Sequence, residues 1–224
     1  MKEKKLFPKI CSWCVAVLIP FVLLMISIRL LITPLFARFE YNLPGFPEDP
    51  YGFSLEDRLK WAEPTIDYLV NSADISYIGT LTFEDGEPIY NDLELSHMAD
   101  VKSVVTGMRI ALMVSMVLIL VINLVAFKGG WLKKIYRGYA RGGWMTVGLI
   151  AAILLFVLLS FDQLFTWFHQ IFFESGTWRF YTSDTLIRLF PMRFWQDSFI
   201  FVGALSLLMG GILILISRRL AKHK

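Results

Sequence analysis

The sequence has few charged residues for its length, and this scarcity is the first clue to its class. Charged side chains make up 18% of the 224 residues and hydrophobic side chains 56%, with a mean hydropathy of +0.57. A soluble globular domain typically carries about 25% charged and about 45–50% apolar residues. One water-exposed domain cannot bury such an excess of apolar side chains, so the composition predicts an integral membrane protein.

Cysteine is also scarce: the chain contains only Cys11 and Cys14. The two form a C-x-x-C, a spacing found in redox proteins. Here the pair lies in an apolar run near the N-terminus and outside any βαβ pattern, so two buried thiols are the favoured interpretation. Residues 33–106 and 169–198 contain no cysteine, which excludes a disulfide-stapled domain in either segment.

The signature motifs of several enzyme classes are missing from the sequence. It has no G-x-S-x-G, no Gly-rich phosphate loop and no H-E-x-x-H. A nucleotide is therefore not expected as a partner. Nucleic acid is not expected either, because the basic residues lie at the ends of apolar runs and do not form a patch.

Four apolar runs are long enough to cross a bilayer. At 1.5 Å per residue, a helix needs about 20 residues to span roughly 30 Å of hydrocarbon. Each run contains at most one charged residue. The first run resembles a signal peptide, but it is long for one and no small-x-small cleavage site follows, so we expect an uncleaved anchor. The predicted spans are about residues 11–32, 107–127, 144–168 and 199–217.

Basic residues predict the orientation of these spans. They cluster before the first span, in the short link 128–143 and after the fourth span. Under the positive-inside rule these three segments are cytoplasmic, which places both termini inside. Residues 33–106 and 169–198 are then extracytoplasmic, and the first of these two segments is strongly acidic.

Residues 33–106 are too short and too polar for an independent domain, and we expect a small extracytoplasmic cap. Capping patterns in this segment predict short helices, and one turn motif predicts a possible β-hairpin. The predicted fold is an all-α membrane protein, a single membrane domain over residues 1–224 with four transmembrane helices and this cap. The patterns are Ser54-x-x-Asp57, Asn91-x-x-Glu94 and, between Tyr77–Phe83 and Pro88–Tyr90, Asp85-Gly86.

Residues 169–198 are unusually aromatic. Aromatic rings favour the headgroup level of a bilayer, so we expect short interfacial helices in this segment. An ordinary aromatic belt explains only part of so many rings in one loop. The aromatic residues in and beside the segment include Phe172, Phe173, Trp178, Phe180, Tyr181, Phe190, Phe194, Trp195 and Phe199.

Two histidines from distant parts of the sequence fall at the same predicted depth. His97 precedes the second span and His169 follows the third, so both are expected at the outer membrane interface. One histidine alone is more often structural than catalytic, but two at one depth favour a shared site. An imidazole among apolar rings is expected to be neutral near pH 7, and neutral imidazole is a general base. Because no protein nucleophile is evident, we expect the substrate to supply its own.

Carboxylates beside His97 are candidates for orienting its ring. Glu94 and Asp100 lie three residues to either side of this histidine, which predicts one helical face. A carboxylate one turn away can hold an imidazole in one tautomer and raise its basicity. Both are therefore predicted to support catalysis.

Charged residues inside the spans need partners. Asp162 lies in the third span, and pairing with Arg29 or Arg109 is favoured over a functional role. In a functional role it would, like Glu94 and Asp100, support catalysis by orienting a histidine. Arg109 is also a candidate for stabilising negative charge, although an ion pair is the favoured interpretation. The residues expected to line a substrate pocket are Phe168, Phe172 and Trp178.

A metal-dependent outer-face hydrolase is an alternative use of the same residues. Two histidines and two carboxylates could bind zinc and leave an open position. The H-x-x-D spacing is a weak pattern, so neither a metal nor another cofactor is predicted. A haem clamped by the histidines is less favoured still. A non-enzymatic membrane assembly factor is the third possibility. The zinc set would be His97, Asp100, Asp162 and His169.

The sequences around both histidines resemble those of a known family. They read E-L-S-H-M-A-D-V-K at 94–102, D-Q-L-F-T-W-F-H-Q-I-F-F-E-S-G-T-W-R-F at 162–180 and T-L-I-R-L-F-P at 185–191. These motifs resemble the bacterial lipoprotein intramolecular transacylases, which are four-helix membrane proteins with an outer cap. The topology agrees along the whole chain.

The resemblance implies an enzyme of the bacterial cell membrane that acts on diacylglyceryl-modified lipoproteins among membrane lipids. An acyl chain would move from the sn-2 glyceryl ester to the α-amino group of the N-terminal cysteine, giving the lyso-form. The resemblance also implies that His97 and His169 are the catalytic pair, acting as general acid and base. Which histidine takes which role stays open at this point.

Overall fold

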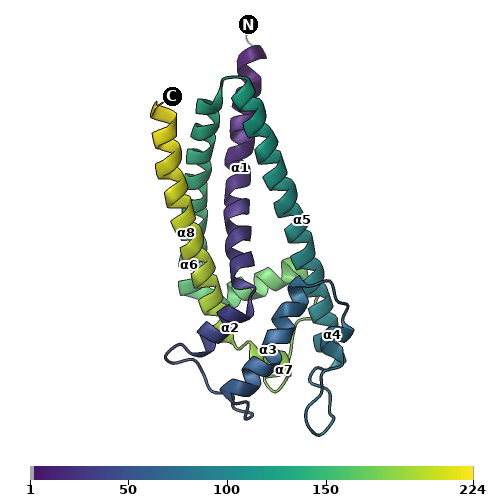
Figure 1. Ribbon diagram of the computed structural model, residues 1–224. Helices are drawn as coiled ribbons and strands as arrows, with labels where there is room; N and C mark the ends of the chain where they lie inside the picture. The colour runs from purple at the N-terminus through teal and green to yellow at the C-terminus, as the bar shows by residue number, and fades with distance from the viewer. Residues whose placement is uncertain (1–2, 224) are drawn as a thin grey trace. The chain divides into compact units, whose positions relative to one another are not determined.

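The computed structural model describes residues 3–223, with side chains described for residues 6–222. Over that range regular secondary structure is helical, and the predicted all-α fold is confirmed. The helices are α1 (Glu3–Leu31), α2 (Pro34–Tyr41), α3 (Leu55–Val70), α4 (Ser76–Gly79), α5 (Asp92–Lys128), α6 (Leu132–Phe172), α7 (Thr185–Leu189) and α8 (Met192–His223) (Figure 1).

Four of these helices, within the described residues, are long and apolar enough to cross a membrane: α1, α5, α6 and α8. The chain divides into two compact units, and each long helix has residues in both. The membrane unit comprises Met1–Ile28, Met108–Leu158 and Ile200–Lys224. The cap unit comprises Arg29–Gly107 and Leu159–Phe199.

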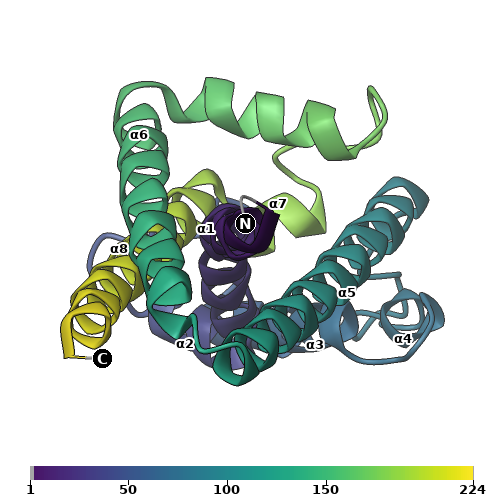
Figure 2. The ribbon, with the colours of Figure 1, turned by 90° about the horizontal axis from the view of Figure 1, so that it is seen from above.

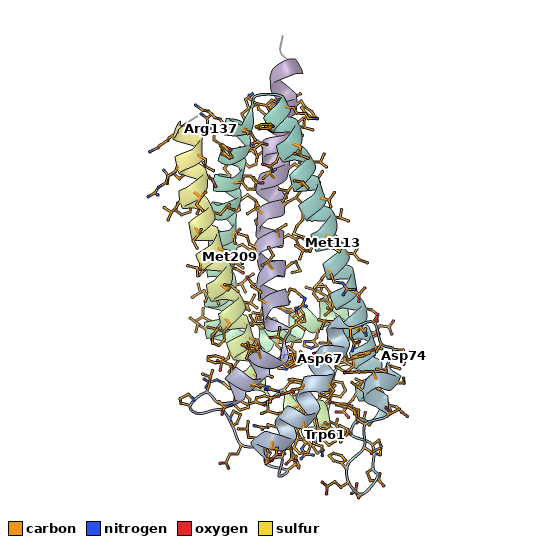
Figure 3. All side chains as sticks on the ribbon, viewed as in Figure 1. Trp61, Asp67, Asp74, Met113, Arg137 and Met209 are labelled. Atoms are coloured by element: carbon orange, nitrogen blue, oxygen red, sulfur yellow. The ribbon has the colours of Figure 1, made fainter. Side chains whose placement is uncertain are left out.

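In the membrane unit, α1 lies among the other three long helices (Figures 1 and 2). Its apolar face packs against α5, the start of α6 and α8, and Met209 of α8 contacts this core (Figure 3). Glycines allow the helices to approach closely, as is common in membrane bundles. A Cβ on Gly142 would lie 2.6 Å from the Cβ of Ile19, and a Cβ on Gly143 would lie 2.9 Å from the Gly210 carbonyl oxygen.

Two buried hydroxyls also join helices of the membrane unit. The Ser27 Oγ of α1 lies 2.8 Å from the Ser206 Oγ of α8, and both residues are fully buried. The Ser27 hydroxyl also donates to the Leu23 carbonyl oxygen of its own helix at 3.0 Å, so it can accept the hydrogen bond of Ser206, and both hydroxyls are satisfied without water.

The cap unit has its own apolar core. Helix α3 contacts α2, α4 and α7, and Trp61 on α3 is buried against Phe83 with ring centroids 6.0 Å apart (Figure 3). The predicted capping box at the start of α3 is present, because Asp57 N–H donates to Ser54 Oγ and Ser54 N–H donates to the Asp57 carboxylate. The buried core residues are Ala37, Tyr41, Trp61, Ala62, Ile66, Tyr68, Ile78, Ile89, Tyr90, Met98, Leu186, Leu189, Phe190 and Phe194.

The possible β-hairpin does not form as a pair of strands. Within the described residues, one isolated bridge joins Thr82 to Pro88 around a turn in which Gly86 has a φ of 88°. The residues expected to begin the first strand form the short helix α4, because Asp74 Oδ1 accepts a hydrogen bond from Ser76 N–H and favours a helical turn.

Helix α6 contains a break that separates its two parts. Ser160 has non-helical dihedral angles, with φ −159° and ψ 63°. The residues after the break, 161–172, belong to the cap unit and carry His169. Nothing in the apolar pattern of residues 144–168 indicates this interruption, which determines the direction of the histidine-bearing segment within the cap unit.

Candidate functional site

His97 lies on the second turn of α5, and the start of that helix is held in place by Glu94. The predicted Asn91 capping pattern is present, with Glu94 N–H donating to Asn91 Oδ1 at 3.0 Å and Asn91 N–H donating to Glu94 Oε2 at 2.9 Å. The other carboxylate oxygen, Oε1, accepts a hydrogen bond from Leu186 N–H of α7 at 2.7 Å. Glu94 therefore ties α5 to α7 one turn before the histidine.

His169 lies on the helical segment that follows the break at Ser160. Its Nδ1 is 2.8 Å from the carbonyl oxygen of Phe165, one turn earlier. A carbonyl oxygen only accepts hydrogen bonds, so this contact requires a proton on Nδ1. In the neutral ring Nε2 is then left with a free lone pair.

The two imidazoles meet within the cap unit, 72 residues apart in sequence. Their ring centroids are 6.1 Å apart and the ring planes differ by 21°. His97 is 8% exposed and His169 is 9% exposed. The predicted meeting of these two side chains is thus observed in the geometry of this unit.

Aromatic rings surround both histidines. Phe173 contacts both imidazoles, at centroid distances of 4.8 Å from His97 and 5.5 Å from His169. Phe180 lies 5.3 Å from His97, and Phe165 lies 4.1 Å from His169. Phe165 and Phe173 are each four residues from His169, a spacing that favours contact on one helical face, but neither they nor Phe180 were among the predicted pocket residues.

The three predicted pocket residues lie on the side of His169. Phe168 is 5.5 Å from its ring and Trp178 is 4.8 Å from it, the indole inclined by 34°. Phe172 packs on Phe168 at 5.0 Å and is 38% exposed. The predicted rings therefore form one side of the site, and Phe172 forms its outer part.

Two buried polar atoms at this site have no hydrogen-bond partner in the described part of the chain. They are Nδ1 of His97 and Nε1 of Trp178. Buried polar groups in folded proteins are nearly always paired, so an unpaired nitrogen in such a place indicates a position for a polar ligand group or a water molecule.

The remaining predicted carboxylates do not join the histidines. Asp100 and Asp162 are exposed. Within the described part of the cap unit, Asp162 makes no ion pair with Arg29. The Nη1 of Arg29 donates instead to the Ile32 carbonyl oxygen. Arg109 belongs to the membrane unit. Within residues 3–223, no group of three or more histidine, cysteine, aspartate or glutamate side chains is arranged to hold a metal ion.

A buried ion pair holds α7 against the loop that precedes α3. Arg188 Nη2 donates to Asp49 Oδ2 at 2.9 Å, and Nε donates to the same oxygen at 3.1 Å. Burial alone would raise the pKa of Asp49, but hydrogen bonds from Arg188 and from Phe53 N–H outweigh it and lower the pKa below its ordinary value. The ion pair fixes α7, whose Leu186 N–H donates the hydrogen bond to Glu94.

A second acidic group is buried in the cap unit away from the histidines. Glu40 of α2 is fully buried near Asp197, which pairs with Arg193. Burial, followed by the Asp197 carboxylate, raises the pKa of Glu40 to about 8, although Arg193 lowers it. Glu40 is therefore protonated at neutral pH.

Comparison with known proteins gives a family match over most of the chain. The family model described as lipoprotein intramolecular transacylase Lit matches residues 13–195. This range includes both histidines and the aromatic residues described above that surround them.

Relatives and solved structures extend the likeness to nearly the full length. An uncharacterized protein of Aquifex aeolicus (strain VF5) is 28% identical over 214 residues, covering 96% of this chain and 95% of its own. The membrane integral lipoprotein intramolecular transacylase Lit from Bacillus cereus has the same fold, with a TM-score of 0.81, 18% identity and 96% of each chain covered. Another structure of that enzyme, carrying a histidine-to-alanine mutation, matches with a TM-score of 0.77 and 17% identity over 99% of this chain and 96% of the other.

Proposed function

The chain belongs to the lipoprotein intramolecular transacylase family, and on this premise we propose that His97 and His169 are the acid–base pair of its acyl transfer. It is a multi-pass membrane acyltransferase that transfers an acyl group within lipoproteins. In this proposal the acyl chain leaves the sn-2 glyceryl ester of a diacylglyceryl-modified lipoprotein and is received by the α-amino group of its N-terminal cysteine.

One observation carries the proposal: two buried, nearly parallel imidazoles with ring centroids 6.1 Å apart inside a wall of aromatic rings. This spacing leaves both rings within reach of one small group of reacting atoms. Burial among apolar rings disfavours imidazolium, so at least one ring is available as a base at neutral pH.

The hydrogen bond to Phe165 supports His169 as the base. Its Nδ1–H is held by the carbonyl oxygen, so Nε2 is the nitrogen that can accept a proton. Nδ1 of His97 has no such bond within the described residues, and His97 is assigned the delivery of a proton to the leaving group.

The reaction then balances without a protein nucleophile or a second reactant. The substrate amine attacks the ester carbonyl carbon, and Nε2 of His169 takes the amine proton. The tetrahedral intermediate collapses, the carbon–oxygen bond to sn-2 breaks, and the departing oxygen receives that proton through His97. An amide and a free hydroxyl result, and both imidazoles return to their neutral forms. Each proton transfer of this kind typically contributes about 10²–10⁴-fold.

The aromatic walls would supply the orientation that an intramolecular reaction needs. Both reacting groups belong to one flexible substrate, so holding them in a near-attack geometry could contribute about 7–11 kcal/mol. Phe168, Phe172 and Trp178 are proposed to contact the acyl chain, and Glu94 is proposed to position His97 through its bond to α7. Asp100, Asp162 and Arg109 receive no role in the chemistry.

The proposed location of the site is the outer leaflet. Basic residues precede the span at 11–32 and follow the span at 199–217. They also occupy residues 128–143, which comprise the turn between α5 and α6 and the first turns of α6, where Arg137 lies (Figure 3). The positive-inside rule then places both termini in the cytoplasm and residues 33–106 and 169–198 outside. Lipoprotein N-termini anchored in that leaflet, among its lipids, would reach the histidines directly.

The test is the conversion of a diacylglyceryl lipoprotein in a host that has no transacylase of its own. His97→Gln and His169→Gln should each lower the yield of lyso-form by about 10²-fold or more, as measured by mass spectrometry of lipopeptide N-termini. Normal lyso-form production by both variants would refute the catalytic pair.

A matched control is available in the same chain. His223→Gln removes the third histidine, which lies in the basic C-terminal tail, and should leave the yield unchanged. Treatment with a chelator tests the metal hydrolase, because that enzyme would lose activity and the proposed transacylase would keep it.

A further inference from the structure

We propose that the indole N–H of Trp178 donates a hydrogen bond to the reacting ester carbonyl of the substrate and stabilises the oxyanion that forms there. This inference rests on the proposed function of His97 and His169. It assigns Trp178 a place at the reacting atoms in addition to a place in the pocket wall.

The first observation is the unpaired nitrogen itself. Nε1 of Trp178 is buried, and no acceptor among residues 6–222 lies within hydrogen-bond distance of it. An indole N–H is a donor only, so the missing partner must be an acceptor. A buried tryptophan usually finds such a partner within the protein, and leaving it unpaired is costly.

The second observation is the position of the indole ring. The indole lies against the ring of His169, with centroids 4.8 Å apart and planes inclined by 34°. The proton-accepting Nε2 of His169 must approach the amine that attacks the carbonyl, so the carbonyl oxygen comes within reach of groups beside the same ring. Trp178 is such a group, and its N–H is free.

A third observation concerns what holds the indole. The guanidinium of Arg179 lies 5.5 Å from the centroid of the Trp178 ring, a cation–π distance. A nearby cation makes the indole N–H a stronger donor and favours negative charge in its neighbourhood. Both effects increase as the carbonyl oxygen gains charge, so they act more on the tetrahedral intermediate than on the bound ester.

The ligand that this nitrogen recognises is therefore an acceptor. In the proposed reaction the ester carbonyl oxygen is that acceptor, because the lone pair of the amine is used in the attack on the carbonyl carbon. His97 Nδ1 is the other unpaired buried atom of the site. The ester carbonyl oxygen can accept a hydrogen bond from the Trp178 indole, and the leaving oxygen can accept one from His97, so one substrate can satisfy both atoms.

The experiment compares the parent enzyme with two variants that keep the ring and lose the N–H. Trp178→Phe retains an aromatic side chain against His169, and replacement of Trp178 by benzothienylalanine retains the shape of the bicyclic ring. Each enzyme is purified in detergent and given a synthetic diacylglyceryl lipopeptide, and the rate of lyso-form appearance is measured under single-turnover conditions. Loss of one oxyanion donor typically lowers the rate by about 10²–10³-fold, and we expect a loss in that range from both variants.

A second readout separates the hydrogen bond from packing. The same lipopeptide with an sn-2 ether in place of the ester has no carbonyl oxygen and does not react. Its binding should be equal in the parent and in both variants. Weaker binding of the ether by the benzothienylalanine enzyme would show a packing role, and an unchanged single-turnover rate for this enzyme would also overturn the proposal.

His169→Gln, measured in the same assay, distinguishes a failure of the Trp178 proposal from a failure of the proposed histidine mechanism. If it is inactive while the benzothienylalanine enzyme keeps the parent rate, Trp178 is not the oxyanion donor and the histidine mechanism stands. If His169→Gln keeps the parent rate, the proposed function fails, and this inference fails with it.

Discussion

Replacing Asp49 by asparagine should destabilise the cap unit strongly, because the substitution leaves Arg188 partly buried without its counter-ion. The Asp49 side chain is fully buried and that of Arg188 is 14% exposed. Removing one partner of a buried pair typically costs about 3–5 kcal/mol. The remaining exposure of Arg188 favours the lower limit, about 3 kcal/mol.

Thermal unfolding in detergent micelles measures this loss. For a chain of this size, 1 kcal/mol corresponds to about 2–4 °C in Tm, so Asp49→Asn should lower Tm by about 6–12 °C. The lyso-form yield should fall as well, because α7 carries both Arg188 and the N–H of Leu186 that holds Glu94.

The chain offers a matched control in the exposed ion pair Arg38–Glu63, whose side chains are 58% and 27% exposed. Glu63→Gln removes the same kind of charge but should cost no more than about 1 kcal/mol, since solvent screens the pair. Equal Tm shifts for Asp49→Asn and Glu63→Gln would contradict this prediction, because burial would then have no influence on the energy of the ion pair.

Further predictions concern pH, helix contact and the position of His97. Because the pKa of Glu40 is raised, the folded protein keeps a proton between about pH 4.5 and 8 that the unfolded chain releases. The free energy of unfolding should therefore fall as the pH rises through that window. Glu40→Gln should abolish this part of the pH dependence of Tm. Gly142→Ala should cost about 1–3 kcal/mol because its Cβ would overlap the neighbouring helix, whereas Gly148→Ala, with no atom within 4 Å of its Cβ, should be neutral in the same unfolding measurement. Glu94→Ala should lower the rate of lyso-form production by releasing α5 from Leu186, and a parent rate in this variant would remove Glu94 from the positioning of the site.

The helical class could be predicted from the apolar runs, and the pairing of the histidines could be predicted because each flanks a run at the same expected depth. A stretch of about 20 apolar residues has one inexpensive conformation in a bilayer, so hydropathy alone predicts the long helices. The contacts of Phe165 and Phe173 with His169 also follow from spacing, because each lies four residues away and one helical turn takes 3.6 residues.

Helical spacing was less informative for the carboxylates. Each step of three residues falls about 60° short of a full turn, so Glu94, His97 and Asp100 drift around α5 and do not share one line. The drift leaves Glu94 and His97 buried and Asp100 exposed. Which of two equally spaced carboxylates is buried depends on where α7 packs, and α7 lies about 90 residues further along the chain.

The local properties of this protein follow from the order of its residues: the long apolar helices, the capping of α3 and α5, and the aromatic character of the histidine surroundings. Four other features depend on how distant segments pack: the break at Ser160, the bond from Leu186 to Glu94, the ion pair between Asp49 and Arg188, and the unpaired nitrogen of Trp178. The difference lies in the range of the interactions. Hydropathy and capping act within one or two helical turns, whereas the partner of a buried charge or donor is chosen by packing between segments that are distant in the chain.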